Sequence, residues 1–447
     1  MRVQEVVKGG KPMKTNRILW IVVAAIVLVS LLVSGFGCKA PATIPTTTVP
    51  TTTVPTTTAP GEIKLGIVVP LTGSWGPWGI AVVRGAEVWA ELVNADGGVE
   101  VAGKKYLLKI YGYDDLDFGA SEGLKSVKKG VLEDGVKIFE ITPTAAVIEA
   151  VAPFLQEQGG LLISHGASFG LRAEWPHVMS GYTSWPVFQG TSILYLHEQF
   201  PGVKTAAVIY PDASYVPDER PWINIGLRVA GIEKVYEEII PADTVDFAPV
   251  LSAVLAKNPD MISMDSIAPS YYGDIMSIAR GMGYQGKWHG NTFTMDAILQ
   301  KVPADYAEGA IVGSPNMDNQ SLVDPMLYRI YQEYTSRWPP DFTTDYVCAV
   351  GTLSNVVKGM QLAGTTTDIA KIIETMHATD PFPTMYMGTG AWAGEEIWGV
   401  NNAIFTPSLV GQVRNGKSSL TKVVAFDEFY RDNLSIIIEE LEAEKNR

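Results

Sequence analysis

Short β-branched runs alternate with helix-length amphipathic segments along almost the whole chain from Glu62 onward. Strand–helix alternation favours a mostly parallel sheet with helices on both faces, and so many units favour two sheets over one. We therefore predict an α/β protein built as two doubly wound parallel-sheet lobes. The expected strands are IKLGIVVP, YLLKIYGY, VKIFEI, LLIS, TAAVIYP, KVYEEII, DMISMD and KWHG. The expected helices span about 78–95, 119–134, 145–158, 184–199, 219–230, 246–257, 270–283, 324–337, 345–363 and 367–377.

The loops after the expected strands are where a site is expected, because ligands of such sheets bind beyond the carboxyl ends of the strands. Most of these loops offer hydroxyls, small residues or aromatics directly ahead of a helix start. Exposed amides at helix N-termini, together with Ser and Thr hydroxyls, suit a carboxylate or another polar head group. Ordinary N-capping explains such residues equally well in any single loop, so the pattern across several loops carries the weight. The loops are PLTGSWGPWG (Pro70–Gly79), TPTAA (Thr142–Ala146), SHGAS (Ser164–Ser168), YPDASY (Tyr210–Tyr215), DSIAPSYYG (Asp265–Gly273) and GNTFTMD (Gly290–Asp296).

The segment 1–38 has the pattern of an export signal. A basic flank precedes the unbroken apolar run ILWIVVAAIVLVSLLV (Ile18–Val33), and SGFGCKA follows it. The run holds about 16 residues, against the roughly 20 of a spanning helix. Three alternatives stay open: acylation of Cys38 in a stretch that resembles a bacterial lipobox, an uncleaved membrane anchor, and simple secretion. Each of them exports the rest of the chain, to the periplasm or the cell surface.

Residues 39–61 form a Thr/Pro-rich linker that contains TTTVPTTTVPTTTAP (Thr46–Pro60). Proline and β-branched residues disfavour helix, and nothing in the segment can build a core, so it is expected to be extended and solvated. We interpret it as a stalk that reaches at most roughly 45 Å. A low-complexity segment without function is the alternative, and the hydroxyls could also carry O-glycans.

Charge and cysteine content limit the partners. The chain has 34 Lys and Arg against 48 Asp and Glu, a formal net charge of −14. This acidic balance argues against nucleic acid or anionic lipid as a partner. The two cysteines are Cys38 and Cys348, so acylation of Cys38 would leave no intramolecular disulfide. Cys348, within YVCAVG, is expected to be a small buried hydrophobe.

The sequence shows no catalytic constellation. Its five histidines have no H-E-x-x-H or other compact metal spacing, and neither a G-x-S-x-G elbow nor a G-x-x-x-x-G-K-[ST] loop is present. Glu395 and Glu396 are adjacent, which in most local geometries points their side chains apart. His165, within SHGAS, is the only histidine expected to face the cleft, as a structural side chain or as a ligand contact. We expect no enzyme, no cofactor and no metal.

Five segments in order and spacing carry a family resemblance: IKLGIVVPLTGSWGPWG, GAEVWAELVNADGGV, KIYGYDD, LLISHGAS and AAVIYPDASY. The chain resembles, over roughly Ile63 to Asn415, the substrate-binding proteins of bacterial branched-chain amino acid ABC transporters, the leucine/isoleucine/valine-binding type. The resemblance implies the type I periplasmic-binding-protein fold, in which two lobes joined by three crossovers close on a ligand. It assigns the first lobe to 62–183 plus 314–388 and the second lobe to 184–313 plus 389–447.

The resemblance also nominates ligand-binding residues. TPTAA and SHGAS take the place of the family's carboxylate-binding loops, where backbone N–H groups do much of the work. Trp78 corresponds to an aromatic of the first loop, and Tyr215 to a tyrosine that reaches across from the second lobe. The nominated set is Trp78, Thr142, Thr144, Ala145, Gly166, Ala167, Ser168, Tyr215, Asp265, Thr292 and Tyr346.

Thr292 is a departure from the family pattern. In HGNTF it stands where amino-acid binders of this family have an acidic residue that meets the ligand's ammonium group. Burying an ammonium group without a counter-charge is costly. Either Asp265 or Asp296 substitutes from a neighbouring loop, or the ligand lacks an ammonium group. An amide, a urea-like compound, an aliphatic acid or an aromatic acid would meet the second condition.

The function implied by the resemblance is solute capture. A monomeric, extracytoplasmic protein, held at the membrane by a lipid anchor or an N-terminal helix, would bind a small polar or carboxylate-bearing molecule and deliver it to an ABC permease. The alternative is a ligand-sensing receptor subunit that acts through a partner protein, because the same fold serves in receptors.

Overall fold

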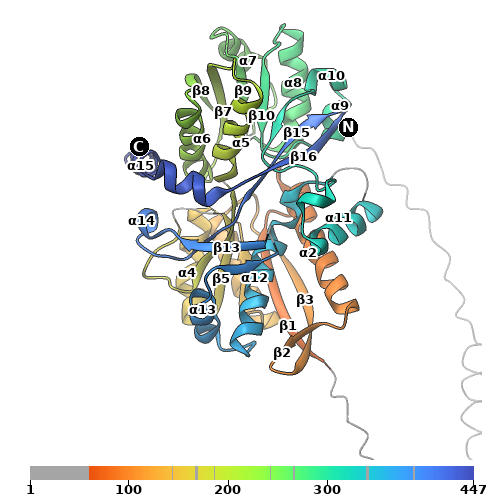
Figure 1. Cartoon of the computed structure of the whole chain (residues 1–447), viewed down its shortest axis with the longest axis vertical. Coiled ribbons are helices and arrows are strands. Elements are labelled where there is room, and N and C mark those ends of the chain that lie inside the picture. The colour runs from red at the N-terminus through yellow and green to blue at the C-terminus, as the bar shows by residue number, and fades with distance from the viewer. Residues whose placement is uncertain are drawn as a thin grey trace, which may run out of the picture. The chain divides into compact units, whose positions relative to one another are not determined.

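Two sheets organise the part of the chain that the computed structural model describes, residues 60–142, 144–166, 170–185, 187–241, 243–264, 267–338, 342–385 and 388–447. The two sheets belong to one compact unit. In Figure 1 the first sheet lies in the lower lobe and the second in the upper lobe. The segments before Pro60, with the apolar run, Cys38 and the Thr/Pro repeat, lie outside the described residues.

The first sheet has nine strands within the described residues, and its inner strands are parallel. β14, β6, β5, β4, β1 and β3 pair in parallel, whereas β12, β13 and β2 are added antiparallel at the two edges. The order is β12 (Phe382–Thr384), β13 (Gly388–Ala393), β14 (Ala403–Phe405), β6 (Val178–Trp185), β5 (Leu161–Gly166), β4 (Ile138–Ile141), β1 (Gly61–Val69), β3 (Lys104–Asp114) and β2 (Val99–Val101).

The second sheet has seven strands in the same described part of the chain. Five of them pair in parallel, and β15 and β16 are antiparallel at one edge. The order is β16 (Lys417–Val424), β15 (Ser408–Arg414), β11 (Ile311–Val312), β10 (Lys287–Gly290), β9 (Met261–Ser263), β7 (Thr205–Asp212) and β8 (Glu233–Pro241). The prediction of two mostly parallel sheets in an α/β fold is confirmed.

Helices cover both faces of the first sheet because its strands are apolar on alternate sides. In β1, Leu65 and Ile67 join the core below α2 and α12, whereas Val68 joins the core below α3 and α4. The helices of this lobe are α2 (Gly76–Ala95), α3 (Ala120–Lys129) with the π-turn η1 (Gly130–Asp134), α4 (Ala145–Glu157), the 3₁₀ turns η3 (Gln320–Leu322) and η4 (Thr344–Val347), α11 (Pro325–Arg337), α12 (Cys348–Ala363), α13 (Ile369–His377) and α14 (Glu395–Trp398).

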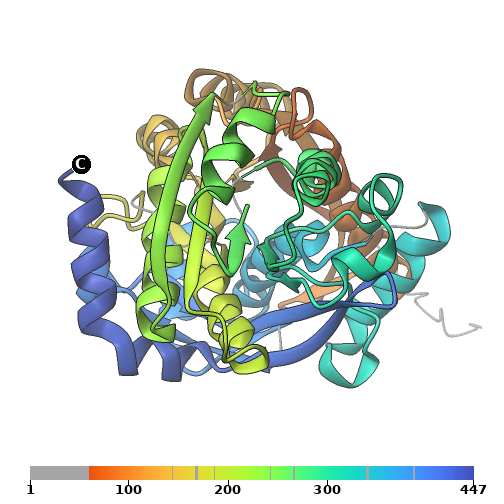
Figure 2. The same cartoon turned by 90° about the horizontal axis from the view of Figure 1, so that it is seen from above.

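The second lobe has its own helices, and one of them closes the chain. The set comprises α5 (Val187–Gln199), α6 (Val216–Ala230), α7 (Ala248–Leu255), η2 (Pro269–Tyr271), α8 (Tyr272–Gly281), α9 (Met295–Leu299), α10 (Ala304–Ala307) and α15 (Phe426–Lys445). α15 lies beside α6 (Figure 2), where the Arg220 guanidinium pairs with the Glu444 carboxylate. No helix among the described residues is long and apolar enough to span a membrane.

Traced through the described residues, the chain passes between the sheets three times, after β6, after β11 and after β14. The last passage differs from the sequence prediction, which placed it at residue 388. β13 and β14 both pair within the first sheet, so the chain leaves that lobe only at residues 406–407. Asn415 (φ 52°) and Gly416 (φ 72°) then form the turn of the β15–β16 hairpin, because two left-handed residues suit a two-residue loop.

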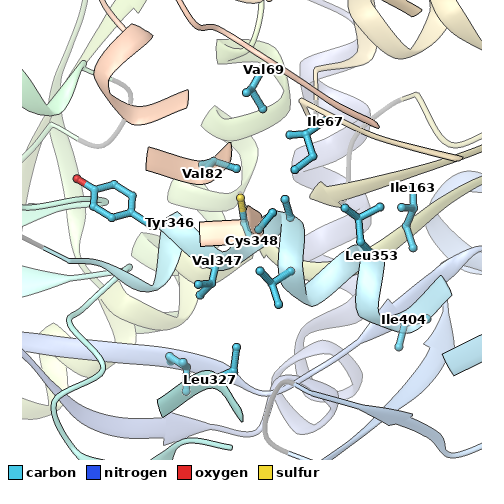
Figure 3. Packing of buried hydrophobic residues seen from close by; sticks show 14 of the residues in the cluster. Ile67, Val69, Val82, Ile163, Leu327, Tyr346, Val347, Cys348, Leu353 and Ile404 are labelled. Carbon is cyan, nitrogen blue, oxygen red and sulfur yellow. The ribbon is translucent and has the colours of Figure 1, made fainter. Parts of the chain in front are cut away.

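The largest core links α12 to the strands of the first sheet. Figure 3 shows Val347, Cys348 and Leu353 of this segment packed among buried side chains that include Ile67 and Ile163. Cys348 has no solvent exposure, as expected for a small buried hydrophobe. The η4 turn at the start of α12 is packed into the same core through Tyr346 and Val347.

Candidate functional site

The carboxylate of Asp345 lies at the centre of a polar cluster between the lobes. Trp78 Nε1 of α2 donates to its Oδ2 (2.8 Å), and Thr292 Oγ1, just after β10, donates to the same oxygen (3.1 Å). Ser314 Oγ, just after β11, lies 3.4 Å from Oδ1. Asp345 is only 4% exposed. Because Trp78 belongs to the first lobe and Thr292 to the second, one buried carboxylate joins both lobes.

Burial raises the pKa of the Asp345 carboxyl, although the charge of His165 and the three hydrogen bonds oppose the rise. A close approach of α2 and η4 makes this geometry possible. A Cβ at Gly85 would lie 2.0 Å from the carbonyl oxygen of Tyr346, so only glycine lets η4 lie against α2. Asp345 of η4 then reaches the indole of Trp78, which lies two turns before Gly85 on α2.

A second buried pair lies beside Asp345, at the ends of neighbouring parallel strands. His165 Nδ1, at the end of β5, contacts Glu140 Oε1 of β4, and both side chains are almost fully buried. The His165 ring lies 5.9 Å from the ring of Trp78. Glu140 Oε2 is buried and has no hydrogen-bond partner among the described residues. The site therefore holds two buried carboxylates and one buried imidazole.

The N-terminus of α4 is the position at which the sequence predicts a ligand carboxylate. Here the backbone N–H of Ala145 donates to Oδ2 of Asp218 (3.1 Å), in the first turn of α6 in the other lobe. Asp218 is 3% exposed. The Thr142 hydroxyl lies 2.9 Å from both the Val68 carbonyl oxygen and Asp115 Oδ2, within its own lobe. The Asp218 carboxylate of the protein itself thus accepts the hydrogen bond of the Ala145 N–H at the start of this helix.

Aromatic rings from both lobes lie beside the polar cluster. Trp75 Nε1 donates to the hydroxyl of Tyr215 (3.2 Å), and the ring of Phe118 lies 4.9 Å from the ring of Tyr215. Trp75 also contacts Trp78 edge to face, with 5.9 Å between ring centroids. Tyr215 is 7% exposed, and this burial raises the pKa of its hydroxyl. Tyr215 is thus the contact of the second lobe with the aromatic wall of the first.

A pocket opens on the outer side of these rings. It encloses about 470 Å³, part of which is open to solvent, and its wall combines Trp75 and Phe118 of the first lobe with Tyr215, Phe247 and Tyr271 of the second. Most of its lining is apolar or aromatic. The pocket is therefore a largely apolar space lined by both lobes.

The loop after β3 holds the first-lobe aromatics in place through strained backbone. Leu116, Asp117 and Phe118 have φ of 53°, 58° and 66°, a left-handed run that costs each non-glycine residue on the order of 1 kcal/mol or more. Carboxylates offset this cost: Asp115 accepts from the Phe118 N–H (3.0 Å), and Asp117 accepts from the Trp75 N–H (3.1 Å). The strained loop thus helps to position the rings of Trp75 and Phe118.

The structure brings most of the nominated residues to this region. Trp78 and Thr292 meet at Asp345, Tyr215 lies in the aromatic wall, and Gly166 is buried at the end of β5. The remaining nominated residues that the structure describes are Thr142, Thr144 and Ala145 at the junction of β4 and α4, and Tyr346. Ala167, Ser168 and Asp265 lie outside the described residues, as does Cys38.

The nominated Tyr346 and Asp296, the alternative source of an acid, have other surroundings. Tyr346 directs its ring to an aromatic group on the α11 side, with 5.8 Å to the Tyr334 ring and 6.0 Å to the Phe342 ring. Asp296 is exposed at the start of α9. Another acid, Asp345, lies beside Thr292 and accepts from its hydroxyl; it was not nominated from the sequence.

Comparisons with known proteins agree with this architecture. A profile of periplasmic binding proteins matches residues 62–417. The Leu/Ile/Val-binding protein of Escherichia coli K12 is 24% identical over 270 residues, which cover 59% of this chain and 71% of that protein.

Two solved structures share the fold at low sequence identity. A branched-chain amino acid transporter substrate-binding protein from Streptococcus pneumoniae, in complex with isoleucine, has a TM-score of 0.64 at 20% identity, over 81% of this chain and 99% of that one. A solute-binding protein of an ABC transporter from R. palustris, in complex with benzoate, has a TM-score of 0.63 at 15% identity, over 82% and 97%.

Proposed function

The chain belongs to the periplasmic binding protein family, and we propose that it is the extracytoplasmic, membrane-tethered solute-binding component of an ABC transporter. In this proposal a small polar or carboxylate-bearing molecule, such as an amino acid or a related amide or organic acid, binds between the lobes. The closed form is then recognised by a permease. No catalytic step is part of the proposal.

The observation that carries the proposal is the polar cluster at Asp345. Its carboxylate accepts hydrogen bonds from Trp78 of the first lobe and from Thr292 of the second. A molecule held here contacts both lobes, and such a molecule shifts an opening and closing equilibrium by its differential affinity for the closed form. Three chain passages between the sheets provide the hinge for that motion.

The comparisons support a solute-binding role without selecting the solute. The name of the Escherichia coli relative refers to leucine, isoleucine and valine, whereas one solved neighbour holds isoleucine and another holds benzoate. The shared fold thus accommodates zwitterionic and purely anionic molecules in different proteins. For this chain the side chains of the site must decide the solute.

Membrane attachment in the proposal rests on the N-terminal segment. Acylation of Cys38 or retention of the apolar run Ile18–Val33 would hold the chain at the membrane, and the Thr/Pro linker would let the lobes move. The partners are then one small molecule and a permease, with the protein acting as a monomer. The acidic composition argues against nucleic acid as a further partner.

A thermal-shift screen of the purified protein tests this function. The panel comprises amino acids, amides, urea, short aliphatic acids, aromatic acids and amines. A compound at 1,000 times its Kd stabilises the folded state by about 4 kcal/mol, which is a readily measured rise in Tm. Calorimetry should then give one site per chain for each hit. A protein that none of these compounds stabilises would contradict the proposed role.

A further inference from the structure

We propose that the site between the lobes takes a small organic cation that has no carboxylate, such as a primary amine. This inference rests on the proposed function and narrows it to one class of solute. It follows from where the structure places the buried carboxylates, from the aromatic rings beside them, and from the state of the α4 N-terminus.

The place for a ligand carboxylate is filled by the protein. The Ala145 N–H, at the start of the 13-residue helix α4, donates to Oδ2 of Asp218. A helix N-terminus favours one nearby anion, and Asp218 supplies it from the opposite lobe. A ligand carboxylate would either displace this contact between the lobes or lie against a buried negative charge. The Ala145 N–H therefore supports contact between the lobes through the Asp218 carboxylate, and not through an anionic ligand.

The place for a ligand cation is provided by Asp345 and Glu140. Three hydrogen-bond donors reach the Asp345 carboxylate, which has about four acceptor positions. Glu140 Oε2 is buried and, within the described part of the chain, has no hydrogen-bond partner. Each carboxylate therefore has acceptor capacity that the described side chains do not use. An ammonium group offers the three donors that such a pair can accept.

The charge balance around these groups also favours a cation. Glu140 and Asp345 are 0% and 4% exposed. The imidazole of His165 already pairs with Glu140. Among the described residues, Arg220 is the one lysine or arginine that is buried, and its guanidinium pairs with Glu444 of α15. Two buried carboxylates thus adjoin one imidazole, and because buried charges need partners, this pair favours a positive group.

The rings beside the carboxylates suit an organic cation better than a hydrated metal ion. Trp75, Trp78, Phe118 and Tyr215 form one connected aromatic group over both lobes. The indole N–H of Trp78 is directed to Asp345, and its ring contacts Trp75, so the carboxylate adjoins this aromatic group. Ring faces attract ammonium groups, and aromatic walls take up the apolar part of the same molecule.

Calorimetry with leucine and three relatives that share its branched side chain tests the inference. 3-Methylbutylamine is leucine without its carboxylate, 4-methylpentanoate is leucine without its ammonium group, and leucinamide keeps the cation while losing the anion. We expect the amine and leucinamide to bind at least about tenfold more tightly than leucine, and 4-methylpentanoate to show no binding. Tighter binding of leucine or of 4-methylpentanoate would overturn the inference and leave the proposed function standing. If none of the probes and no member of the wider panel binds, both fall.

Variants assign the effect to individual carboxylates. Asp345→Asn should weaken 3-methylbutylamine binding by at least about tenfold, whereas Asp296→Asn, which removes an exposed carboxylate, should leave it unchanged. Asp218→Asn should increase affinity for leucine and 4-methylpentanoate, because it removes the negative charge at the Ala145 amide. Glu140→Gln is the second test of the cation position should circular dichroism show that Asp345→Asn does not fold. Unchanged affinity for 3-methylbutylamine in folded Asp345→Asn, or in folded Glu140→Gln where Asp345→Asn does not fold, would overturn the assignment.

Discussion

Replacement of Asp115 by asparagine should make the protein more stable at neutral pH and leave it nearly unchanged at pH 4. Asp115 has no solvent exposure, accepts from the Phe118 N–H (3.0 Å) and lies 2.9 Å from the Thr142 hydroxyl. Burial raises the pKa of its carboxyl to about 6, with hydrogen bonds to Phe118 and Thr142 opposing the rise. Asparagine cannot ionise: its Oδ1 can accept from the Phe118 N–H, and its Nδ2 can donate to the Thr142 hydroxyl, which in turn donates to the Val68 carbonyl oxygen.

The direction follows from proton binding in the two states. Since the folded-state pKa is about 6 and the ordinary value is 3.8, the native protein holds more protons than the unfolded chain between those pH values. The free energy of unfolding therefore falls as pH rises from about 4 to about 6 and stays lower above that range. The difference in pKa corresponds to about 3 kcal/mol, so Asp115→Asn should gain up to about 3 kcal/mol over the wild type at pH 7.5.

Urea unfolding at pH 4 and at pH 7.5, followed by circular dichroism, measures both differences. Other groups titrate over the same range, so the quantity to compare is the variant minus the wild type at each pH. Asp296→Asn is the matched control for the loss of one carboxylate charge at an exposed position. A difference between Asp115→Asn and the wild type that is the same at both pH values would refute the reasoning.

Three further predictions concern the cleft, its support and the anchor. For any solute that stabilises the protein, Tyr215→Ala should lower the binding affinity at least about tenfold, while Tyr215→Phe, which keeps the ring contacts with Trp75, should lower it only about threefold. Calorimetry compares the two variants. Equal affinities of the alanine variant and the wild type would count against a role of Tyr215 in closure. Gly85→Ala should cost on the order of 1–3 kcal/mol in urea unfolding, because its Cβ would meet a carbonyl oxygen at 2.0 Å, and Gly281→Ala, with open space around it, should be nearly neutral. Cys38→Ser should abolish incorporation of labelled fatty acid in cells and release the protein from the membrane fraction; label retained by the variant would exclude acylation at this residue.

Local periodicity was sufficient to predict most of the fold. Runs such as IKLGIVVP and YLLKIYGY appear as β1 and β3, because buried parallel strands need apolar residues on both faces. β14 has only three residues and pairs with β6 through a single register position, so no local pattern marks it. The lobe to which β13 and β14 belong depends on this long-range pairing. That dependence explains why the last passage between lobes lies at 406–407 instead of 388.

The site was predictable where a loop follows a strand, and unpredictable where only a tertiary contact gives a residue its role. Asp345 belongs to TTDYVCAVG, which reads as the start of a helix at residue 345. The α-helix begins instead at Cys348, and the 3₁₀ turn before it directs Asp345 to Trp78. Asp218 likewise resembles any acidic residue in a first helical turn, where it would favour the helix dipole. Only its contact with Ala145 across the lobes distinguishes it.

The acidic residues around the cleft show why composition alone could not identify the solute. Burial alone would raise the pKa of Asp114, yet hydrogen bonds from the Leu71 and Leu116 N–H groups hold it below its ordinary range, whereas burial dominates at the adjacent Asp115. Asp114 therefore serves backbone donors, and its charge is already satisfied. Asp345 is different, because its donors come from both lobes and its burial raises its pKa. A positive group bound there would restore the ionised form and stabilise the contact between lobes together, so closure and recognition of charge would depend on one carboxylate.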